Sequence, residues 1–117
     1  MIIRKNRFHG HHSVSRVRGP SLHGEHVSVR FAGNGRADYR AAVVVSKKVD
    51  KRAVVRNRIR RRLFEILRVE CNLSGKPIDV IIYAKTVNIA TVPHDVLVKE
   101  VCDLIQKAQS RTPAARA

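Results

Sequence analysis

The stretch "VVRNRIRRRLFEILR", residues 54–68, combines an apolar repeat with a dense row of arginines. Apolar residues recur every three or four positions, the spacing of one helix face. Projected at about 100° per residue, residues 52–70 form an apolar sector made of Val55, Ile59, Leu63, Ile66 and Leu67. The other side holds Asn57, Arg58, Arg60, Arg61 and Arg68. The pattern predicts a helix that packs on a sheet with one face and meets a partner with the other.

Three flanking segments have the composition of strands. Residues 26–31 alternate apolar and polar side chains, which is typical of a half-buried strand. Residues 39–46 are rich in β-branched residues and poor in polar ones, and residues 78–84 are almost entirely apolar. Both compositions favour buried strands of one sheet.

Two more helices are expected towards the ends of the chain. Val14 and Val17 have the spacing of a short helix that Gly19 and Pro20 would end. A last helix should begin near Pro93 and bury Leu97, Val101, Leu104 and Ile105. The elements together predict a two-layer α+β sandwich with one open sheet face. We expect a single RNA-binding domain over residues 1–110 and a disordered tail over 111–117.

The net charge indicates the class of partner. The chain carries 24 Lys and Arg against 9 Asp and Glu, a formal charge of +15 with a pI near 11.3. Such a chain binds polyanions, of which nucleic acid and anionic membrane surfaces are the abundant kinds. No apolar run approaches the roughly 20 residues that span a bilayer, and "MIIRKNRFHGHH" lacks the apolar core of a signal peptide. We therefore expect a cytoplasmic protein with no membrane partner.

Catalytic and metal-binding patterns are missing from the sequence. The nine acidic residues form no D-x-D or E-x-x-H pattern, so we predict no catalytic residues. His9, His11 and His12 lie beside Gly10 in a basic terminus without the fixed geometry of a metal site, so none is predicted there. Cys71 and Cys102 are expected as buried thiols and not as a disulfide.

The basic cluster is too one-sided for an ordinary solvated helix face. Between residues 47 and 68 the only acids are Asp50 and Glu65, whereas solvated faces mix signs at helical spacing. The ten cations are Lys47, Lys48, Lys51, Arg52, Arg56, Arg58, Arg60, Arg61, Arg62 and Arg68. The guanidinium fork binds phosphate through two hydrogen bonds and stacks on bases. The preference for Arg in the helix therefore favours folded nucleic acid over lipid.

Residues 45–68, "VSKKVDKRAVVRNRIRRRLFEILR", closely resemble the signature of the bacterial ribonuclease P protein subunit. The shared features are a Ser-Lys-Lys at the end of a strand, an Ala-Val before the helix, and Arg-Asn-Arg followed by Ile and two basic residues. The order of elements and the chain length are similar over nearly the whole molecule.

The resemblance implies an αβββαβα order and a small sheet with an uncommon left-handed βαβ crossover. It implies a non-catalytic subunit of an endoribonuclease, itself monomeric, which assists the 5′ maturation of precursor tRNA. The partners would be the catalytic RNA and precursor tRNA, and Mg²⁺ would be bound mainly by the RNA. The implied RNA contacts are Lys47, Lys48, Arg52, Arg56, Asn57, Arg58, Arg60, Arg61, Phe64 and Arg68. The cleft for the 5′ leader, between the basic helix and the sheet, would use Val14, Arg18, Ser46 and Lys47.

Four positions depart from the family pattern. Asp50 stands where relatives usually have Gly, and Phe64 stands where they usually have a basic residue. Val14 and Arg18 occupy positions that are commonly aromatic in the leader cleft. Phe64 leaves two alternatives open: it stacks on an unpaired base, as its place between Arg60 and Arg68 suggests, or it widens the apolar face.

Two other functions fit the composition. A ribosomal or other RNA-binding protein is the first alternative, and a DNA-binding module is the second. Phosphate attraction does not depend on sequence, so charge cannot separate these classes. Only the resemblance favours ribonuclease P.

Overall fold

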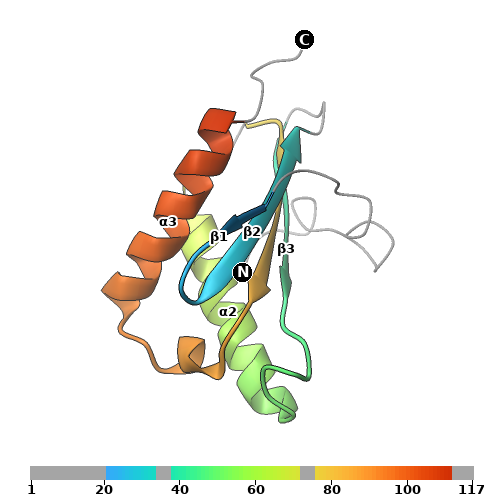
Figure 1. The fold of residues 1–117 in the computed structure, drawn as a ribbon, viewed down its shortest axis with the longest axis vertical. Helices are drawn as coiled ribbons and strands as arrows, with labels where there is room; N and C mark the ends of the chain where they lie inside the picture. Colours follow the sequence, from blue (N-terminus) through green and yellow to red (C-terminus); the bar gives the residue numbers. More distant parts are fainter. Residues whose placement is uncertain (1–20, 34–37, 72–75, 112–117) are drawn as a thin grey trace.

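Four strands form one mixed sheet that carries both long helices on the same face (Figure 1). The structure is a computed structural model, and it describes residues 21–33, 38–71 and 76–111. In chain order the elements are β1 (Ser21–His23), β2 (Val27–Gly33), β3 (Arg40–Val44), α2 (Ala53–Val69), β4 (Ile78–Ala84), the 3₁₀ helix η2 (Val87–Ala90) and α3 (His94–Arg111).

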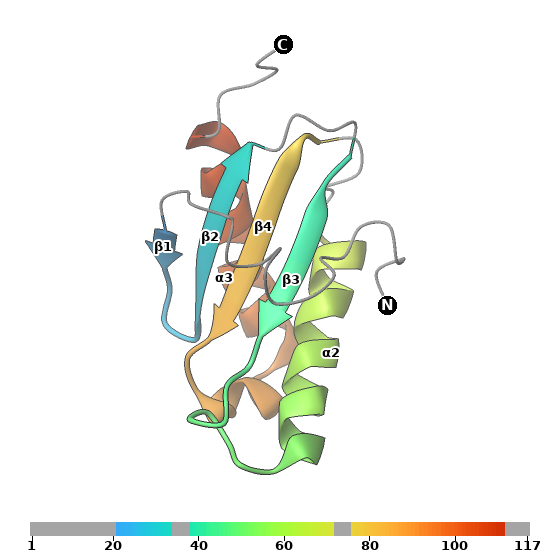
Figure 2. The ribbon, with the colours of Figure 1, turned by 90° about the vertical axis from the view of Figure 1, so that its right-hand side faces the viewer.

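The sheet has the strand order β1-β2-β4-β3. β2 pairs antiparallel with β1 and β4, whereas β3 and β4 are parallel and are joined by α2. In Figure 2 the helices lie behind the sheet, β3 and β4 both point down, and the chain passes from β3 to β4 on its left. This crossover is therefore left-handed, against the usual right-handed preference and in agreement with the expectation.

The core lies between the sheet and the two helices. Alternate strand residues such as Val29, Val80 and Ile82 point into it and are completely buried. From the helices it receives Ile59, Leu63, Ile66, Leu67, Leu97, Val101, Leu104 and Ile105. All the apolar helix residues expected from the spacing are thus in the core, apart from Val55, which is partly buried against it. The 3.6-residue period therefore identified most of the helix side chains that the core buries.

Glu100 of α3 holds the turn between β1 and β2. Its Oε2 accepts hydrogen bonds from the backbone N–H of His26 at 2.7 Å and of Val27 at 3.0 Å, and its Oε1 lies 2.6 Å from His26 Nδ1. A Cβ on Gly24 would lie 2.6 Å from Glu100 Oε2, so a larger residue in this turn would push the carboxylate away from these hydrogen bonds. Burial opposes ionisation of Glu100, but the hydrogen bonds from His26 and Val27 outweigh it and lower its pKa.

The observed elements differ from the expected ones mainly at their ends. The predicted strands at 26–31 and 39–46 are observed as β2 and β3, and the predicted strand at 78–84 is observed with the same bounds. The helix expected at 52–70 is α2, and the helix expected near Pro93 is α3. The short strand β1 supplies the third strand of the expected order, while η2 was not predicted. The expected helix around Val14 and Val17 and the tail beyond α3 lie outside the described residues.

Among the described helices, none combines the length and the apolar character needed to cross a membrane.

Candidate nucleic-acid interface

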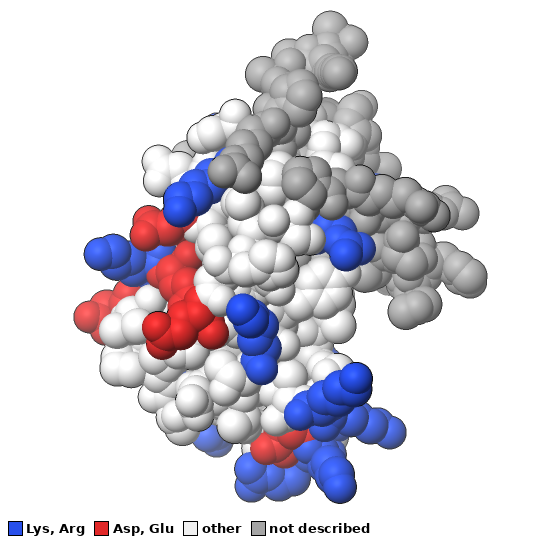
Figure 3. All heavy atoms as spheres, viewed as in Figure 1, with Lys and Arg blue, Asp and Glu red and all other residues white. Residues whose placement is uncertain are grey.

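The turn after β3 and the first half of α2 bring eight cations together. We call this set the basic surface: Lys47, Lys48, Lys51, Arg52, Arg56, Arg58, Arg60 and Arg61. In Figure 3, Lys and Arg gather at the lower right, around the start of α2, with little acidic surface among them, whereas acidic side chains gather on the opposite side over α3. The surface forms because only residues 45–52 separate the end of β3 from the start of α2, so the lysines of this connection are close in the chain to the first turns of the helix.

Asp50 organises the entry into α2. Its carboxylate accepts hydrogen bonds from the Arg52 backbone N–H at 2.8 Å and from the Arg52 guanidinium at 3.1 and 3.0 Å. Arg56 Nη1 donates to the carbonyls of Asp50 and Lys51 at 3.2 and 3.1 Å. The hydrogen bonds from Arg52 lower the pKa of Asp50, so this carboxylate stays ionised at neutral pH. Asp50, which departs from the family pattern, thus fixes the first turn of the helix and the directions of Arg52 and Arg56.

Arg58 and Arg61 carry the most available charge of α2. Both are exposed, and the described parts of the chain offer neither a hydrogen bond nor an ion pair to their guanidinium groups. With Val54, Asn57 and Arg62 they line an open depression on the helix. Arg60 is partly buried and donates to Asn57 Oδ1 at 2.6 Å, which orients both side chains. The group Asn57, Arg58, Arg60 and Arg61 is therefore brought together as predicted.

Arg62 has a different role from its neighbours. Its Nη1 donates to the Ile89 carbonyl at 2.6 Å, and its Nη2 donates to the Val92 carbonyl at 2.8 Å. These contacts join α2 to η2 and to the segment before α3. The guanidinium of Arg62 is thus directed towards the protein.

Arg68 does not belong to the basic surface. It lies 12 residues after Arg56, about 18 Å along the helix, and it pairs with Glu65 at 2.8 Å. This ion pair raises the pKa of Arg68 and lowers that of Glu65. Arg68 lies seven residues beyond Arg61, about 10 Å along the helix, and its guanidinium is engaged by Glu65.

Phe64 is part of the core, which corrects its inclusion among the RNA contacts. Only 7% of its surface is exposed, and it belongs to the same apolar cluster as Leu63 and Leu67. An aromatic ring needs a free face to stack on a base. The helical projection placed Phe64 outside the apolar sector, but α2 is covered over a wider sector in its second half, so the ring is enclosed.

The residues predicted for the leader cleft are only partly described. Ser46 and Lys47 are exposed in a turn closed by the Val49 N–H, which donates to the Ser46 carbonyl at 3.1 Å. Val14 and Arg18 lie outside the described residues. Between α2 and the sheet the described side chains leave no cleft, because Ile59, Leu63 and Ile66 fill that space as core.

The opposite face of the sheet carries polar groups that the sequence did not single out. The Arg30 guanidinium lies over the Tyr83 ring, 5.7 Å from its centroid, and Arg30 Nε is buried without a hydrogen-bond partner in the described structure. On the same face Arg40 donates to both carboxylate oxygens of Asp79, at 3.0 and 2.7 Å. The signal was the alternation of residues 26–31, which placed Arg30 on the polar side of its strand.

Metal binding by the protein finds no support in the described residues. No three His, Cys, Asp or Glu side chains lie close enough there to hold an ion. His9, His11 and His12 lie outside the described residues.

A known family model matches most of the chain, and solved structures of proteins with related names share its fold. Residues 3–109 match the model of the family described as Ribonuclease P. No curated protein matches the sequence. The fold is similar to that of the RNase P protein of Staphylococcus aureus, with a TM-score of 0.71 at 23% identity over 88% of this chain and 94% of that one. It is also similar to the RNase P protein of Thermotoga maritima, with a TM-score of 0.68 at 25% identity over 76% of this chain and 83% of that one.

Proposed function

Because the chain belongs to the ribonuclease P family, whose model matches residues 3–109, we propose that it binds the catalytic RNA of ribonuclease P and the 5′ leader of precursor tRNA. In this role it assists the Mg²⁺-dependent removal of the leader. It contributes binding and charge, and the RNA contributes the reacting groups. The proposed place of action is the cytoplasm, and the proposed active form contains one copy of this chain.

The basic surface is the observation that carries this proposal. It presents the exposed Lys47 and Lys48 together with Arg58 and Arg61, for which the described residues supply no partner. A guanidinium group of this kind can donate two hydrogen bonds to one phosphate group, and its charge displaces condensed counterions from the RNA. An RNA partner of the ribonucleoprotein gains affinity there, while the fold loses nothing because these side chains do not support the core.

The leader is proposed to cross the face of the sheet opposite α2 and α3, starting from Ser46 and Lys47. The stacked pair Arg30 and Tyr83 lies on that face, and both side chains are partly exposed. Aromatic rings and guanidinium planes are the groups on which unpaired bases stack. This face therefore suits a single strand, whereas the basic surface suits a folded RNA.

Mg²⁺ is proposed to be bound mainly by the RNA. When bound, it would supply the activation of water and the stabilisation of the leaving oxygen. The side chains of this chain would lower the repulsion between RNA phosphates, so that fewer divalent ions are needed for assembly.

Reconstitution tests the proposal. A bacterial ribonuclease P RNA is incubated with a precursor tRNA at a Mg²⁺ concentration too low for the RNA to act alone, with and without the protein. We expect 5′ cleavage only when the protein is present, and none by the protein without RNA. A protein that binds RNA but leaves the Mg²⁺ requirement unchanged would contradict the proposal, as would cleavage by the RNA-free protein after purification controls.

A further inference from the structure

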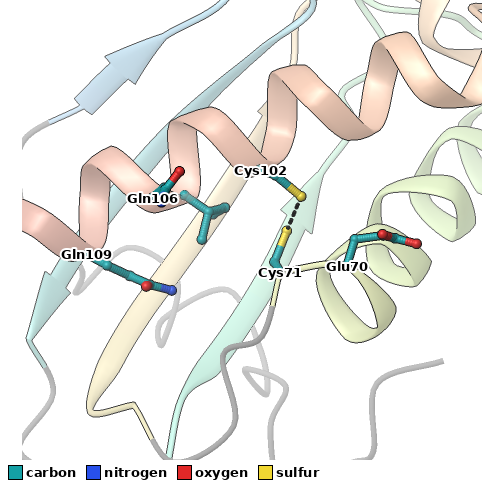
Figure 4. Close-up of a pocket in the computed structure, with 6 residues that line it drawn as sticks. Glu70, Cys71, Cys102, Gln106 and Gln109 are labelled. Carbon is teal, nitrogen blue, oxygen red and sulfur yellow. Dashed lines mark hydrogen bonds between the residues drawn. The ribbon is translucent and has the colours of Figure 1, made fainter.

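Two cysteines that are far apart in the sequence meet where α2 ends. Cys71 follows the last turn of α2 and Cys102 lies on α3, and their sulfur atoms are 3.4 Å apart (Figure 4). Both are free thiols, and of the two predicted as buried, Cys71 is buried whereas Cys102 is only partly so. Their separation of 31 residues resembles no cysteine motif, so only the packing of α2 against α3 brings them together.

The thiol pair lines a pocket that is open to solvent. The other lining residues are Glu70, Ile105, Gln106 and Gln109, and Figure 4 shows the two sulfur atoms facing each other at this site. Cys71 is buried, whereas Cys102 is partly exposed. A small molecule in the pocket can therefore reach Cys102 first, with Cys71 directly behind it.

We propose that Cys71 and Cys102 form a reversible intramolecular disulfide by exchange with a low-molecular-weight disulfide. The Cys102 thiolate attacks one sulfur of the small disulfide, forms a mixed disulfide and releases one small thiol. Cys71 then loses its proton to solvent and attacks the Cys102 sulfur, which forms the Cys71–Cys102 bond and releases the second small thiol. The two protein thiols are oxidised by two electrons, and the small disulfide is reduced to two thiols.

The surroundings of the thiols set the speed of this exchange. Burial raises the pKa of Cys71, and the neighbouring Cys102 and Glu70 raise it further. Burial also raises the pKa of Cys102. The reactive thiolate is therefore scarce at neutral pH, and the exchange should accelerate as the pH rises. The pair is a slow site for modification, in contrast to the low-pKa thiols of catalytic cysteines.

The bond would brace the fold without covering the basic surface. It closes a loop of 31 residues between α2 and α3 and so restricts the unfolded chain. Figure 1 shows the end of α2 on the opposite side of the molecule from its start, where the basic surface lies. The modification should raise thermal stability and leave RNA affinity unchanged, and it does not depend on the proposed function.

The test uses the full chain and glutathione disulfide at a mildly alkaline pH. After free thiols are blocked, peptide mapping without reductant should show one cross-linked peptide containing Cys71 and Cys102. The oxidised protein should melt about 10 °C higher than the reduced protein, and dithiothreitol should remove the difference.

Two serine variants test the role of each cysteine. Cys102→Ser should form no intramolecular bond, and Cys71→Ser should stop at the mixed disulfide of Cys102 with glutathione. Both variants should lack the oxidation-dependent rise in melting temperature. A wild-type protein that accumulates only the mixed disulfide, or that forms the cross-link only in denaturant, would overturn the proposal. Since the decisive measurement is on the wild-type chain, a variant that fails to fold does not affect the outcome.

Discussion

The basic surface and the contact between α3 and the β1–β2 turn use charge in opposite ways. At the turn, the Glu100 side chain is only 15% exposed, and it accepts hydrogen bonds from two backbone N–H groups and contacts the His26 ring. On the basic surface, Arg58 and Arg61 are exposed, and the described residues provide no partner for either. One charge is enclosed and fully used by the fold, whereas the others remain available to a ligand.

The difference shows how one helix can serve both purposes. Arg62 follows Arg61 directly, yet its guanidinium is bound to the Ile89 and Val92 carbonyls. A step of one residue turns a side chain by about 100° around a helix, which is enough to move it from the exposed side of α2 to the side that contacts η2. An arginine of α2 therefore stabilises the fold only where its guanidinium finds acceptors within the protein, as Arg62 does and Arg61 does not in the described residues.

The largest effect on stability is expected for Phe64→Ala, which tests where the basic surface ends. Removing a buried Phe should cost about 3–5 kcal/mol of unfolding free energy. RNA affinity per folded molecule should not change. Val54→Ala is the control, because Val54 is 75% exposed on the same helix and should stay within about 0.5 kcal/mol of wild type. Phe64→Ala with normal melting and weak RNA binding would restore the base-stacking interpretation.

A smaller loss, about 2–3 kcal/mol, is expected for Glu100→Gln because charge-assisted hydrogen bonds are removed. The pKa of Glu100 is lowered in the folded protein, so its contribution is present above the ordinary value of 4.5 and is lost as the pH falls through the folded value. The two proteins should therefore converge in stability in acid, as measured by urea unfolding at several pH values.

Asp103→Asn is the control for Glu100→Gln, because Asp103 is an exposed acid on the same helix. It should change stability little at any pH. A constant difference between wild type and Glu100→Gln from neutral to acid pH would mean that ionised Glu100 does not stabilise the turn.

The smallest loss of stability, about 1–2 kcal/mol, is expected for Arg62→Met, which keeps the aliphatic stem and removes two hydrogen bonds to carbonyls. Arg61→Met changes the adjacent, exposed residue and should leave the melting temperature close to wild type. Equal melting of the two variants, measured by circular dichroism, would show that the contacts of Arg62 with Ile89 and Val92 do not stabilise η2.

Much of the fold could be predicted because several elements have a clear period or a strongly apolar composition. Alternation identified β2, and the helical repeat identified α2 and the buried side of α3. The dense charge at residues 47–61 also predicted the basic surface, because unpaired cations along one helix face are costly unless a partner exists.

The remaining features depend on contacts between distant segments. The left-handed crossover came from resemblance and not from any local pattern. The enclosure of Phe64, the contact of Arg62 with η2 and the meeting of Cys71 with Cys102 all depend on how α2, η2 and α3 pack together. Periodicity describes one helix at a time, so it cannot show which neighbour covers the border of an apolar face.

The central claim is that the basic surface, and not the total charge, binds ribonuclease P RNA. The most direct test compares the salt dependence of RNA affinity for wild type, Arg58→Ala/Arg61→Ala, and Lys99→Ala/Lys107→Ala, whose lysines are exposed on α3. Both double variants lose the same charge. We predict that the log–log slope falls by about 0.7–0.9 for each lost phosphate contact in the arginine variant only, with the stability of both unchanged. An equal fall in the slope for both variants would contradict the account.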